Sequence, residues 1–535
     1  MGGHGSFRRA GIVAAVVTAF ALLGAASAGA APLLWAVNSG EDSVSTFEGS
    51  SGRAVGLPIS TGEDPISIAI TPDGKRAYVA NFGGDSVTVI ETATRLPIAT
   101  IPLTANAERI AISPDGKTVY VTIESREKVF EIDTETNEIV DSIVAGTEAS
   151  AVAISPNGEG VLVGIAPEDI QALNLNTGAK SGSPIKVGGF PREIAFSPSG
   201  STAYIAAGEE VDVIVAGAVV KEIPLGGAVS ALAVSPDGTR VYATSSAAKT
   251  FTTISVATNK VLGTPLEIKG EPEEIALTAS GRTAYVATGN GITPVNTATG
   301  AAGTPIARPG AEVFDLVVAP DQAPVAAFDP PVATAGTPVT FSAAASTDLD
   351  STIASYRWTM GDGASPTGLT VDHAFADAGT YFTNLTLVDD EGCSLTQVFT
   401  GRTAYCNGSS LASVTHPVTV KAPSPAGPLC SANFGVGGVS HNRKNGTVRL
   451  RLHFPSTGYF LLFGKKIHAV TRKVRKPGTA VVTLHARVEL NKRLKKTLRA
   501  GVRYRVTFTP SAGCGSKTVH RSVALLRAPR HKRHR

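Results

Sequence analysis

The sequence predicts an all-β fold: a seven-bladed β-propeller, then a β-sandwich, then a basic β-sandwich-like domain. Two observations predict it. A turn sequence returns about every 42 residues, and short runs of alternating apolar and polar residues follow each turn. The composition agrees, because 56 Gly and 33 Pro among 535 residues, with 17% charged residues, favour many short strands joined by tight turns.

Residues 1–31 have the pattern of a secretory signal peptide. Arg8 and Arg9 precede an apolar run over residues 10–23, and small residues around Ala28 follow it. We expect cleavage near Ala31 and export of the mature chain. The mature sequence has no uninterrupted apolar run of about 18 residues, so we expect no transmembrane segment in it.

The repeats occupy residues 32–322. Each turn has a form close to Ser-Pro-Asp-Gly, in which Pro sets φ and Gly supplies a positive φ. Each period then holds four short strands, as a propeller blade does. The repeat region begins in mid-repeat at Trp35, with a second strand that has no first strand before it. It ends with a single first strand over residues 314–319, so we expect its two ends to pair and complete the seventh blade. The turns lie at residues 71–74, 113–116, 155–158, 197–200, 235–238 and, in a weaker form, 278–281.

Residues 111–122, AISPDGKTVYVT, resemble the repeat of the YVTN-type propellers found in exported and surface-layer bacterial proteins. The resemblance covers residues 33–321 and implies the fold. It leaves the activity open, because propellers host hydrolases, lyases, oxidoreductases and binding modules.

Residues 323–421 resemble a PKD domain, an immunoglobulin-like β-sandwich. The resemblance rests on residues 346–350, STDLD, residues 356–363, YRWTMGDG, and residues 379–381, GTY. Trp358 is expected to fill the core, and residues 392–410 form an insertion into the pattern. In this family such domains serve as spacers or adhesive modules.

Charge separates the C-terminal part from the rest. Residues 32–322 hold 18 basic and 34 acidic residues, whereas residues 430–535 hold 25 basic residues and one acidic residue, Glu489. We expect a linker at 422–429, a basic β-rich domain at 430–526 and a disordered basic tail at 527–535. Export argues against a nucleic-acid partner, so anionic envelope polymers are the expected partners of this domain. The alternative is that the charge only keeps a small sandwich soluble.

Four cysteines allow three disulfide pairings. Locality favours Cys393 with Cys406, which flank the insertion, and Cys430 with Cys514, which flank most of the last domain.

Catalysis by a Ser-His-Asp or Cys-His site is excluded within the propeller, because all ten His and all four Cys lie outside residues 32–322. Acid and base work by carboxylates alone stays open. Carboxylates recur in the connection that leads into the innermost strand of six blades. We expect them to surround one end of the channel, as an acidic mouth for a cation, a basic peptide or sugar hydroxyls. The alternative is a solvated loop face that is acidic for solubility. The candidates are Asp64, Glu108, Glu148, Glu193, Glu273, Glu274 and Glu312.

Asp348, Asp350 and Asp362 are candidate calcium ligands, against an alternative role in turns, and no other cofactor is expected. The leading hypothesis is a secreted or surface-attached, monomeric, non-enzymatic binding protein. The propeller would recognise a polysaccharide, cell-wall polymer or surface protein, the PKD domain would act as a spacer, and the basic domain would anchor the chain to the envelope. The alternative is an exported propeller hydrolase or lyase, of the lactonase type, that uses the carboxylates of the mouth.

Overall fold

The computed structural model of the chain describes residues 33–123, 127–289, 291–307, 312–423, 434–455, 457–485, 499–510 and 517–526. The expected signal peptide, the pair Cys430–Cys514 and the basic tail lie outside these residues. The propeller and the PKD region form one compact unit that ends at Lys421, and the residues from Ala422 onward form a second. Within the described residues, no helix has the length and apolar character needed to cross a membrane.

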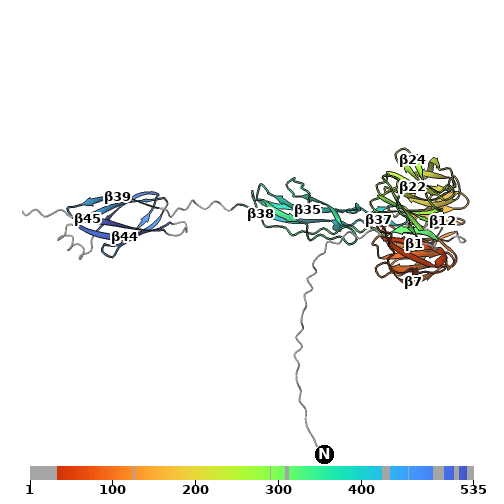
Figure 1. The fold of residues 1–535 in the computed structure, drawn as a ribbon, viewed down its shortest axis with the longest axis horizontal. Helices are drawn as coiled ribbons and strands as arrows, with labels where there is room; N and C mark the ends of the chain where they lie inside the picture. The colour runs from red at the N-terminus through yellow and green to blue at the C-terminus, as the bar shows by residue number, and fades with distance from the viewer. Residues whose placement is uncertain are drawn as a thin grey trace, which may run out of the picture. The chain divides into compact units, whose positions relative to one another are not determined.

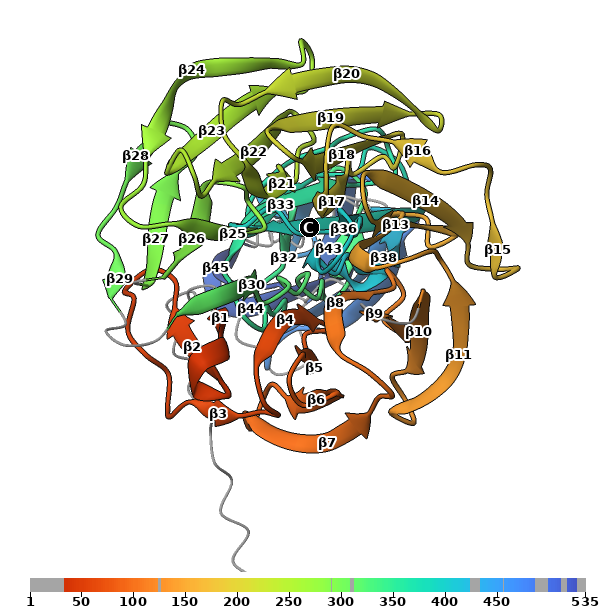
Figure 2. The ribbon, with the colours of Figure 1, turned by 90° about the vertical axis from the view of Figure 1, so that its right-hand side faces the viewer.

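The described residues of the propeller form seven antiparallel sheets of four or five strands, and Figure 2 shows them arranged around a central axis. One strand of each sheet lies innermost, and each innermost strand contacts the next around a closed ring. Below, each blade is named by its innermost strand. These strands are β4 (Pro65–Ile70), β8 (Ala107–Ile112), β12 (Ala149–Ile154), β17 (Pro191–Phe196), β21 (Val229–Val234), β25 (Pro272–Leu277) and β30 (Val313–Val318).

The second and third strands of each blade continue outward from the innermost strand. The second strands are β5 (Arg76–Asn81), β9 (Thr118–Ile123), β13 (Gly160–Ile165), β18 (Thr202–Ala207), β22 (Arg240–Ser245), β26 (Thr283–Thr288) and β1 (Leu33–Asn38). The third strands are β6 (Ser86–Glu91), β10 (Lys128–Asp133), β14 (Asp169–Asn174), β19 (Glu210–Val215), β23 (Thr250–Ser255), β27 (Gly291–Asn296) and β2 (Ser43–Glu48).

The outer strands are more exposed and two of them are split into short pieces. They are β7 (Leu96–Pro102), β11 (Glu138–Val144), β15 (Ala179–Lys180) with β16 (Ile185–Lys186), β20 (Ala218–Pro224), β24 (Lys260–Glu267), β28 (Ala301–Ala302) with β29 (Ile306–Ala307), and β3 (Ile59–Ser60). A short 3-10 turn, η1 (Ser39–Glu41), joins β1 to β2.

The predicted closure of the ring is confirmed. Strand β1 pairs antiparallel with β30, with Trp35 opposite Val317, so the N-terminal strands and the last propeller strand share one sheet. The side chain of Trp35 is fully buried between blades, beside Ile68 and Val79. This pairing joins Trp35 to a residue 282 positions away and leaves the ring without an open edge.

The Ser-Pro-Asp-Gly turns have the expected conformation. In the turn after β8, the N–H of Gly116 bonds to the carbonyl of Ser113, and Gly116 has a φ of +73°. The Ser113 hydroxyl donates to the carboxylate of Asp115, which also accepts the N–H of Lys117. Each residue of the turn sequence therefore has a local role, and their recurrence is a property of the fold.

The PKD region is a β-sandwich whose core contains Trp358, as predicted, with Phe328, Phe341 and Phe375 around it. Figure 1 labels β35 and β38 in this part of the chain. Its elements are β31 (Ala333–Thr334), β32 (Val339–Ser342), β33 (Ile353–Thr359), β34 (Thr370–His373), β35 (Gly379–Asp389), β36 (Val398–Phe399), β37 (Ala404–Cys406), η2 (Ser410–Ala412) and β38 (Ser413–Lys421).

The second unit contains two sheets around one apolar core, which includes Phe454, Phe460 and Phe508. Along β40, apolar side chains are buried while Arg449 and Arg451 are exposed, so the alternation read from the sequence holds. The strands are β39 (Gly435–Asn442), β40 (Thr447–Phe454), β41 (Gly458–Phe463), β42 (Val470–Val474), β43 (Gly478–Leu484), β44 (Arg499–Pro510) and β45 (Lys517–Leu526).

Candidate functional site

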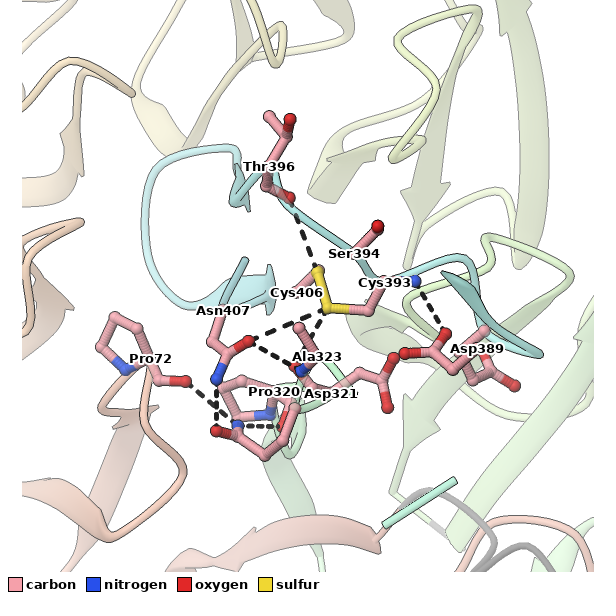
Figure 3. Close-up of a disulfide and its surroundings, with 12 residues drawn as sticks. Pro72, Pro320, Asp321, Ala323, Asp389, Cys393, Ser394, Thr396, Cys406 and Asn407 are labelled. Carbon is pink, nitrogen blue, oxygen red and sulfur yellow. Dashed lines mark hydrogen bonds between the residues drawn. A yellow bond between two sulfur atoms is a disulfide. The ribbon is translucent and has the colours of Figure 1, made fainter. Parts of the chain in front are cut away.

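The insertion in the PKD region is a hairpin closed at its base by a disulfide. Cys393 and Cys406 are bonded, with their Cα atoms 5.5 Å apart, which confirms the predicted pair. The N–H of Cys393 donates to Asp389 Oδ1 at 2.7 Å, and this bond ties the hairpin to the end of β35 (Figure 3). We call residues 393–406 the plug, because of where they lie.

The plug covers the end of the propeller channel where the Ser-Pro-Asp-Gly turns lie. The last residues of four successive innermost strands each donate a backbone N–H to one successive residue of the plug. Ile70 donates to Thr403 Oγ1, Ile112 to the carbonyl of Arg402, Ile154 to that of Gly401 and Phe196 to that of Thr400. One residue of the plug thus matches one blade of the propeller, and the strand ends gain partners they would otherwise find in water.

The fifth blade in this series also contacts the plug, through a side chain. Tyr405 donates its hydroxyl to the carbonyl of Val234, the last residue of β21, at 3.0 Å. Burial raises the pKa of Tyr405 to about 12, so the phenol stays protonated and remains a donor. Gly401 has a φ of +137°, and a Cβ there would lie 2.9 Å from the Cβ of Ala153, so the close fit of the plug requires a glycine.

The third residue of each innermost strand forms a ring at one level of the channel. The 42-residue repeat brings these positions together, although they differ in chemistry. Three are acidic, one is basic and three are small. They are Ser67, Arg109, Ala151, Glu193, Ala231, Glu274 and Asp315.

Arg402 of the plug reaches all three carboxylates of this ring. Its Nη2 lies 2.5 Å from Asp315 Oδ2, and its Nη1 lies 3.2 Å from Glu274 Oε2 and 3.6 Å from Glu193 Oε1. Nη2 also donates to Ser67 Oγ and to the carbonyl of Ile68, each at 3.2 Å. Only 16% of the Arg402 side chain is exposed, so this is a buried ion cluster with one cation from the PKD region and three anions from the propeller.

Burial and charge act in opposite directions on these groups. Burial raises the pKa of Glu193, while Arg402 and then Arg109 lower it, and the net shift is upward. Burial and then the neighbouring Glu193 carboxylate raise the pKa of Glu274 well above its usual range. Burial alone would lower the pKa of Arg402, but Asp315, Glu193 and Glu274 outweigh it, so the guanidinium stays charged. At this level of the channel, three carboxylates therefore face two arginines, Arg402 and Arg109.

The structure divides the residues of the predicted acidic mouth into three groups. Asp64, Glu148 and Glu312 directly precede β4, β12 and β30, as expected for the connections into the innermost strands. Glu108 and Glu273 are the second residues of β8 and β25. Placing Glu108, Glu193, Glu273 and Glu274 in the connecting loops was wrong, because all four lie within innermost strands. Glu193 and Glu274 are the third residues of β17 and β25, and both are buried.

The end of the channel opposite the plug carries a mixed set of charges. Burial raises the pKa of Glu273, Arg192 lowers it, and Glu271 and Glu312 raise it further, so these four charges lie near one another. The guanidinium of Arg109 lies over the ring of Phe314, 5.8 Å from its centroid. This end can therefore meet a ligand with carboxylates, guanidinium groups and aromatic carbon together.

Sequence reasoning missed Arg402 and Asp315. Asp315 was detectable, because it stands at the same distance from the end of its strand as Glu193 and Glu274. Arg402 carried no comparable signal, since it lies in an insertion without a repeat.

A second group of carboxylates lies where the propeller joins the PKD region. Asp321 follows the last propeller strand, Asp348 and Asp350 lie between β32 and β33, and Asp389 ends β35. Asp321 is 8% exposed and Asp389 2%, and each has an Oδ2 that meets no N–H or hydroxyl donor among the described residues, as does Asp348. The carboxyl groups of Asp321 and Asp389 lie close enough to share a proton. Figure 3 shows Asp321 and Asp389 beside the disulfide. We call these four residues the junction carboxylates.

The junction carboxylates disfavour one another's ionised form. Burial, followed by the charges of Asp389, Asp350 and Asp348, raises the pKa of Asp321 to about 9. Burial also raises the pKa of Asp350 to about 7 and that of Asp389 to about 6. Oxygen ligands of this kind are those that Ca²⁺ prefers. Of the predicted calcium ligands, Asp348 and Asp350 belong to this group, whereas Asp362 pairs with His373, its Oδ2 2.7 Å from Nε2.

Comparison with known proteins identifies the family of the β-sandwich that follows the propeller. Residues 321–402 match the PKD domain family, and the match ends within the plug, at Arg402. Such modules are typical of extracellular proteins, where they act as spacers or in adhesion.

Two solved structures resemble the chain in part. Hydrazine synthase of Kuenenia stuttgartiensis is 21% identical, with a TM-score of 0.45, and the match covers 49% of this chain and 92% of that one. A functionally unknown protein from Desulfotomaculum acetoxidans is 17% identical, with a TM-score of 0.48, and the match covers 54% of this chain and 98% of that one.

Proposed function

We propose that this chain is an exported, non-enzymatic binding protein whose propeller recognises a polyhydroxylated surface polymer. The PKD region would carry the propeller, and the basic C-terminal module would hold the chain to an anionic envelope. The resemblance of residues 111–122 to YVTN-type repeats supports an exported bacterial protein, and the match to the PKD family supports an extracellular adhesive or spacer role.

The observation that carries this proposal is the plug. Asp315, Glu193 and Glu274 all face Arg402, so the carboxylates at the centre of the channel already have an internal cation. A carboxylate that acts as a general acid or base must reach its substrate. The internal pairing therefore favours a structural role for this cluster, in which the PKD region is fastened to the propeller.

We therefore assign recognition of the polymer to the end of the channel opposite the plug. Glu273 and Glu312 lie there with Arg192, and Phe190, 42% exposed, precedes β17 on the same side. Carboxylates and guanidinium groups bond to hydroxyls, and an exposed aromatic ring packs against the apolar face of a sugar. This combination suits a polysaccharide better than a simple cation.

A binding experiment tests the proposal. The full-length protein is incubated with insoluble glycans and purified cell walls, and the bound fraction is compared between the parent, Glu273→Gln with Glu312→Gln, and the control Glu138→Gln on the exposed strand β11. We expect binding by the parent and the control, and a loss of about tenfold for the double variant. Equal binding by all three would contradict the proposed surface.

The same samples test the enzymatic alternative. If the bound polymer is cleaved, soluble fragments accumulate with time, and Glu273→Gln abolishes their release. Retention without fragments supports a binding protein, and turnover that depends on Glu273 would replace it with a hydrolase or lyase.

We also propose that the junction carboxylates bind Ca²⁺ and stiffen the joint between the propeller and the PKD region. Buried carboxylates with open oxygens and raised pKa values support this, because a divalent cation would remove their mutual repulsion. Calorimetric titration of Ca²⁺ into the protein after chelator treatment tests it. We expect Asp389→Asn to remove one binding event, and unchanged binding by this variant would contradict the site.

A further inference from the structure

We propose a second hard-cation site on the outer part of the β17 blade, formed by Glu210, Asp212 and Glu222, which takes Ca²⁺. It lies on β19 and β20, outside the channel and the junction, and it goes beyond the proposed function. One ligand atom from each of the three side chains lies within 4.8 Å of the others. Asp212 and Glu222 are opposite one another in the pairing of the two strands, and Glu210 is two residues before Asp212, so all three share one face of the sheet.

Asp212 gives the clearest indication of a ligand. It is 0% exposed, and its Oδ1 has no hydrogen-bond partner among the described residues, whereas Oδ2 accepts the N–H of Gly188 at 2.7 Å. A buried carboxylate oxygen without a partner is costly unless a cation or donor meets it. This oxygen belongs to the side chain at the centre of the acidic group.

Comparison with the β4 blade shows what the side chain at the position of Asp212 does for the fold alone. There, Thr88 stands at the position of Asp212, and its Oγ1 accepts the N–H of Gly62, which stands at the position of Gly188. One hydroxyl thus performs the structural task in that blade. At the same position the other blades carry Ser45, Phe130, Gln171, Thr252 and Thr293, and none of these is charged.

The β17 blade therefore carries a carboxylate where a hydroxyl is sufficient in the β4 blade and an aromatic side chain is accepted in the β8 blade. The excess charge is reinforced by Glu210 and Glu222. Burial, together with the charges of Glu210 and Glu222, raises the pKa of Asp212 to about 6, although the bond from the N–H of Gly188 lowers it. The basic residue beside them, Lys221, is opposite Val213 and so belongs to the other face of the sheet.

The geometry around the group suits a calcium-like ion. Three carboxylates supply up to six oxygens, and Ca²⁺ takes six to eight oxygen ligands in flexible arrangements. Glu222 is exposed, so water can complete the coordination. Glu210 lies directly over Gly188, where a Cβ would be 1.7 Å from Oε1, so the glycine allows this carboxylate to approach Asp212.

Calcium titration of the full-length protein, after removal of bound metal with a chelator, tests the site. The background variant is Asp389→Asn, which separates this site from the junction carboxylates. In that background we compare Asp212→Thr, which installs the residue of the β4 blade, with Asp141→Asn, which removes an exposed carboxylate opposite Glu131 in the β8 blade.

We expect one remaining binding event in the background and in the Asp141→Asn control, with a Kd of about 10⁻⁴ to 10⁻³ M, as in extracellular modules. We expect Asp212→Thr to abolish it with an unchanged circular dichroism spectrum. Glu222→Gln, at an exposed position, should raise the Kd about tenfold and serves if Asp212→Thr folds poorly. The proposal would be overturned if the Asp389→Asn background did not bind Ca²⁺. It would also be overturned if the background bound Ca²⁺ equally well with and without Glu222→Gln or Asp212→Thr.

Discussion

The guanidinium of Arg402 and the carboxylate of Asp315 form an ion pair across two regions of the chain, with Nη2 and Oδ2 2.5 Å apart. Asp315 also accepts the N–H of Ile68 through Oδ2 and that of Leu316 through Oδ1, so its carboxylate is held firmly by the propeller. The pair fastens the plug inside the channel and links the PKD region to the closing blade.

Replacement of Arg402 should destabilise the first unit strongly. Arg402→Gln leaves buried carboxylates without their cation, and loss of one partner of a buried pair costs about 3–5 kcal/mol. We expect a corresponding decrease in the free energy of unfolding, measured by denaturant titration. Arg357→Gln, at an exposed arginine of β33, is the matched control and should change stability little. A similar effect for both variants would contradict the role of the cluster.

Removal of the disulfide should loosen the plug. The bridge closes a loop of 13 residues, and cross-links of about this length stabilise by roughly 3 kcal/mol. In a Cys393→Ser, Cys406→Ser variant we expect faster hydrogen exchange at the amides of Ile112, Ile154 and Phe196, which donate to the plug. Amides within β9 and β13 form their bonds inside the blades and provide the internal control. Unchanged exchange at the three plug-facing amides would show that the hairpin holds without its bridge.

Stability of the first unit should fall as the pH rises above the ordinary glutamate range. The pKa values of Glu193 and Glu274 lie above 4.5 in the folded state, so the folded protein binds more protons than the unfolded chain. The stability that the protonated Glu193 and Glu274 side chains contribute is fully present below pH 4.5. It is lost as the pH rises through their raised pKa values in the folded state.

Glu274→Gln isolates this effect, because the amide cannot ionise. We expect the unfolding free energy of this variant to fall less steeply than that of the parent as the pH rises above 4.5, and the variant to be more stable than the parent once Glu274 would ionise. Glu138→Gln, on an exposed strand, should reproduce the parent curve. A variant curve as steep as that of the parent would assign the pH dependence to other groups.

The C-terminal module should be released from anionic envelopes by salt. Arg449, Arg451, Arg472 and Lys473 are exposed on β40 and β42, and exposed charges lose their attraction beyond about 8 Å at physiological ionic strength. We expect the full-length protein to sediment with envelopes at low salt and to wash off at high salt without protease. Neutralising these four residues should reduce the bound fraction, whereas binding that resists salt would point to a different attachment.

The repeated turns allowed the number of blades, the four strands of each blade and the closure of the ring to be predicted, because turn and strand formation depend on local chemistry. The PKD resemblance and the position of its cysteines similarly predicted the sandwich and the Cys393–Cys406 bridge. Asp64, Glu148 and Glu312 also lie directly before innermost strands, as the spacing indicated.

Which side chains point into the channel depends on shifts in strand register, and the sequence repeat did not reveal these shifts. The pairing of β17 with β18 shifts between Pro191 and Glu193, and that of β25 with β26 shifts between Pro272 and Glu274. Such bulges change which residues face the channel. Glu193 and Glu274 therefore lie inside the channel rather than at its mouth.

Sequence alone determined that this protein is built from repeated four-stranded blades, a PKD-type sandwich and a basic module. The blades follow from local periodicity, the sandwich from the resemblance of residues 346–381 to the PKD pattern, and the module from the distribution of charge. The tertiary structure decided what occupies the channel. Arg402 meets Glu193, Glu274 and Asp315 through contacts that span 87 to 209 positions in the chain. Such contacts depend on the register of a hairpin against five blades at once, and no local pattern specifies that register.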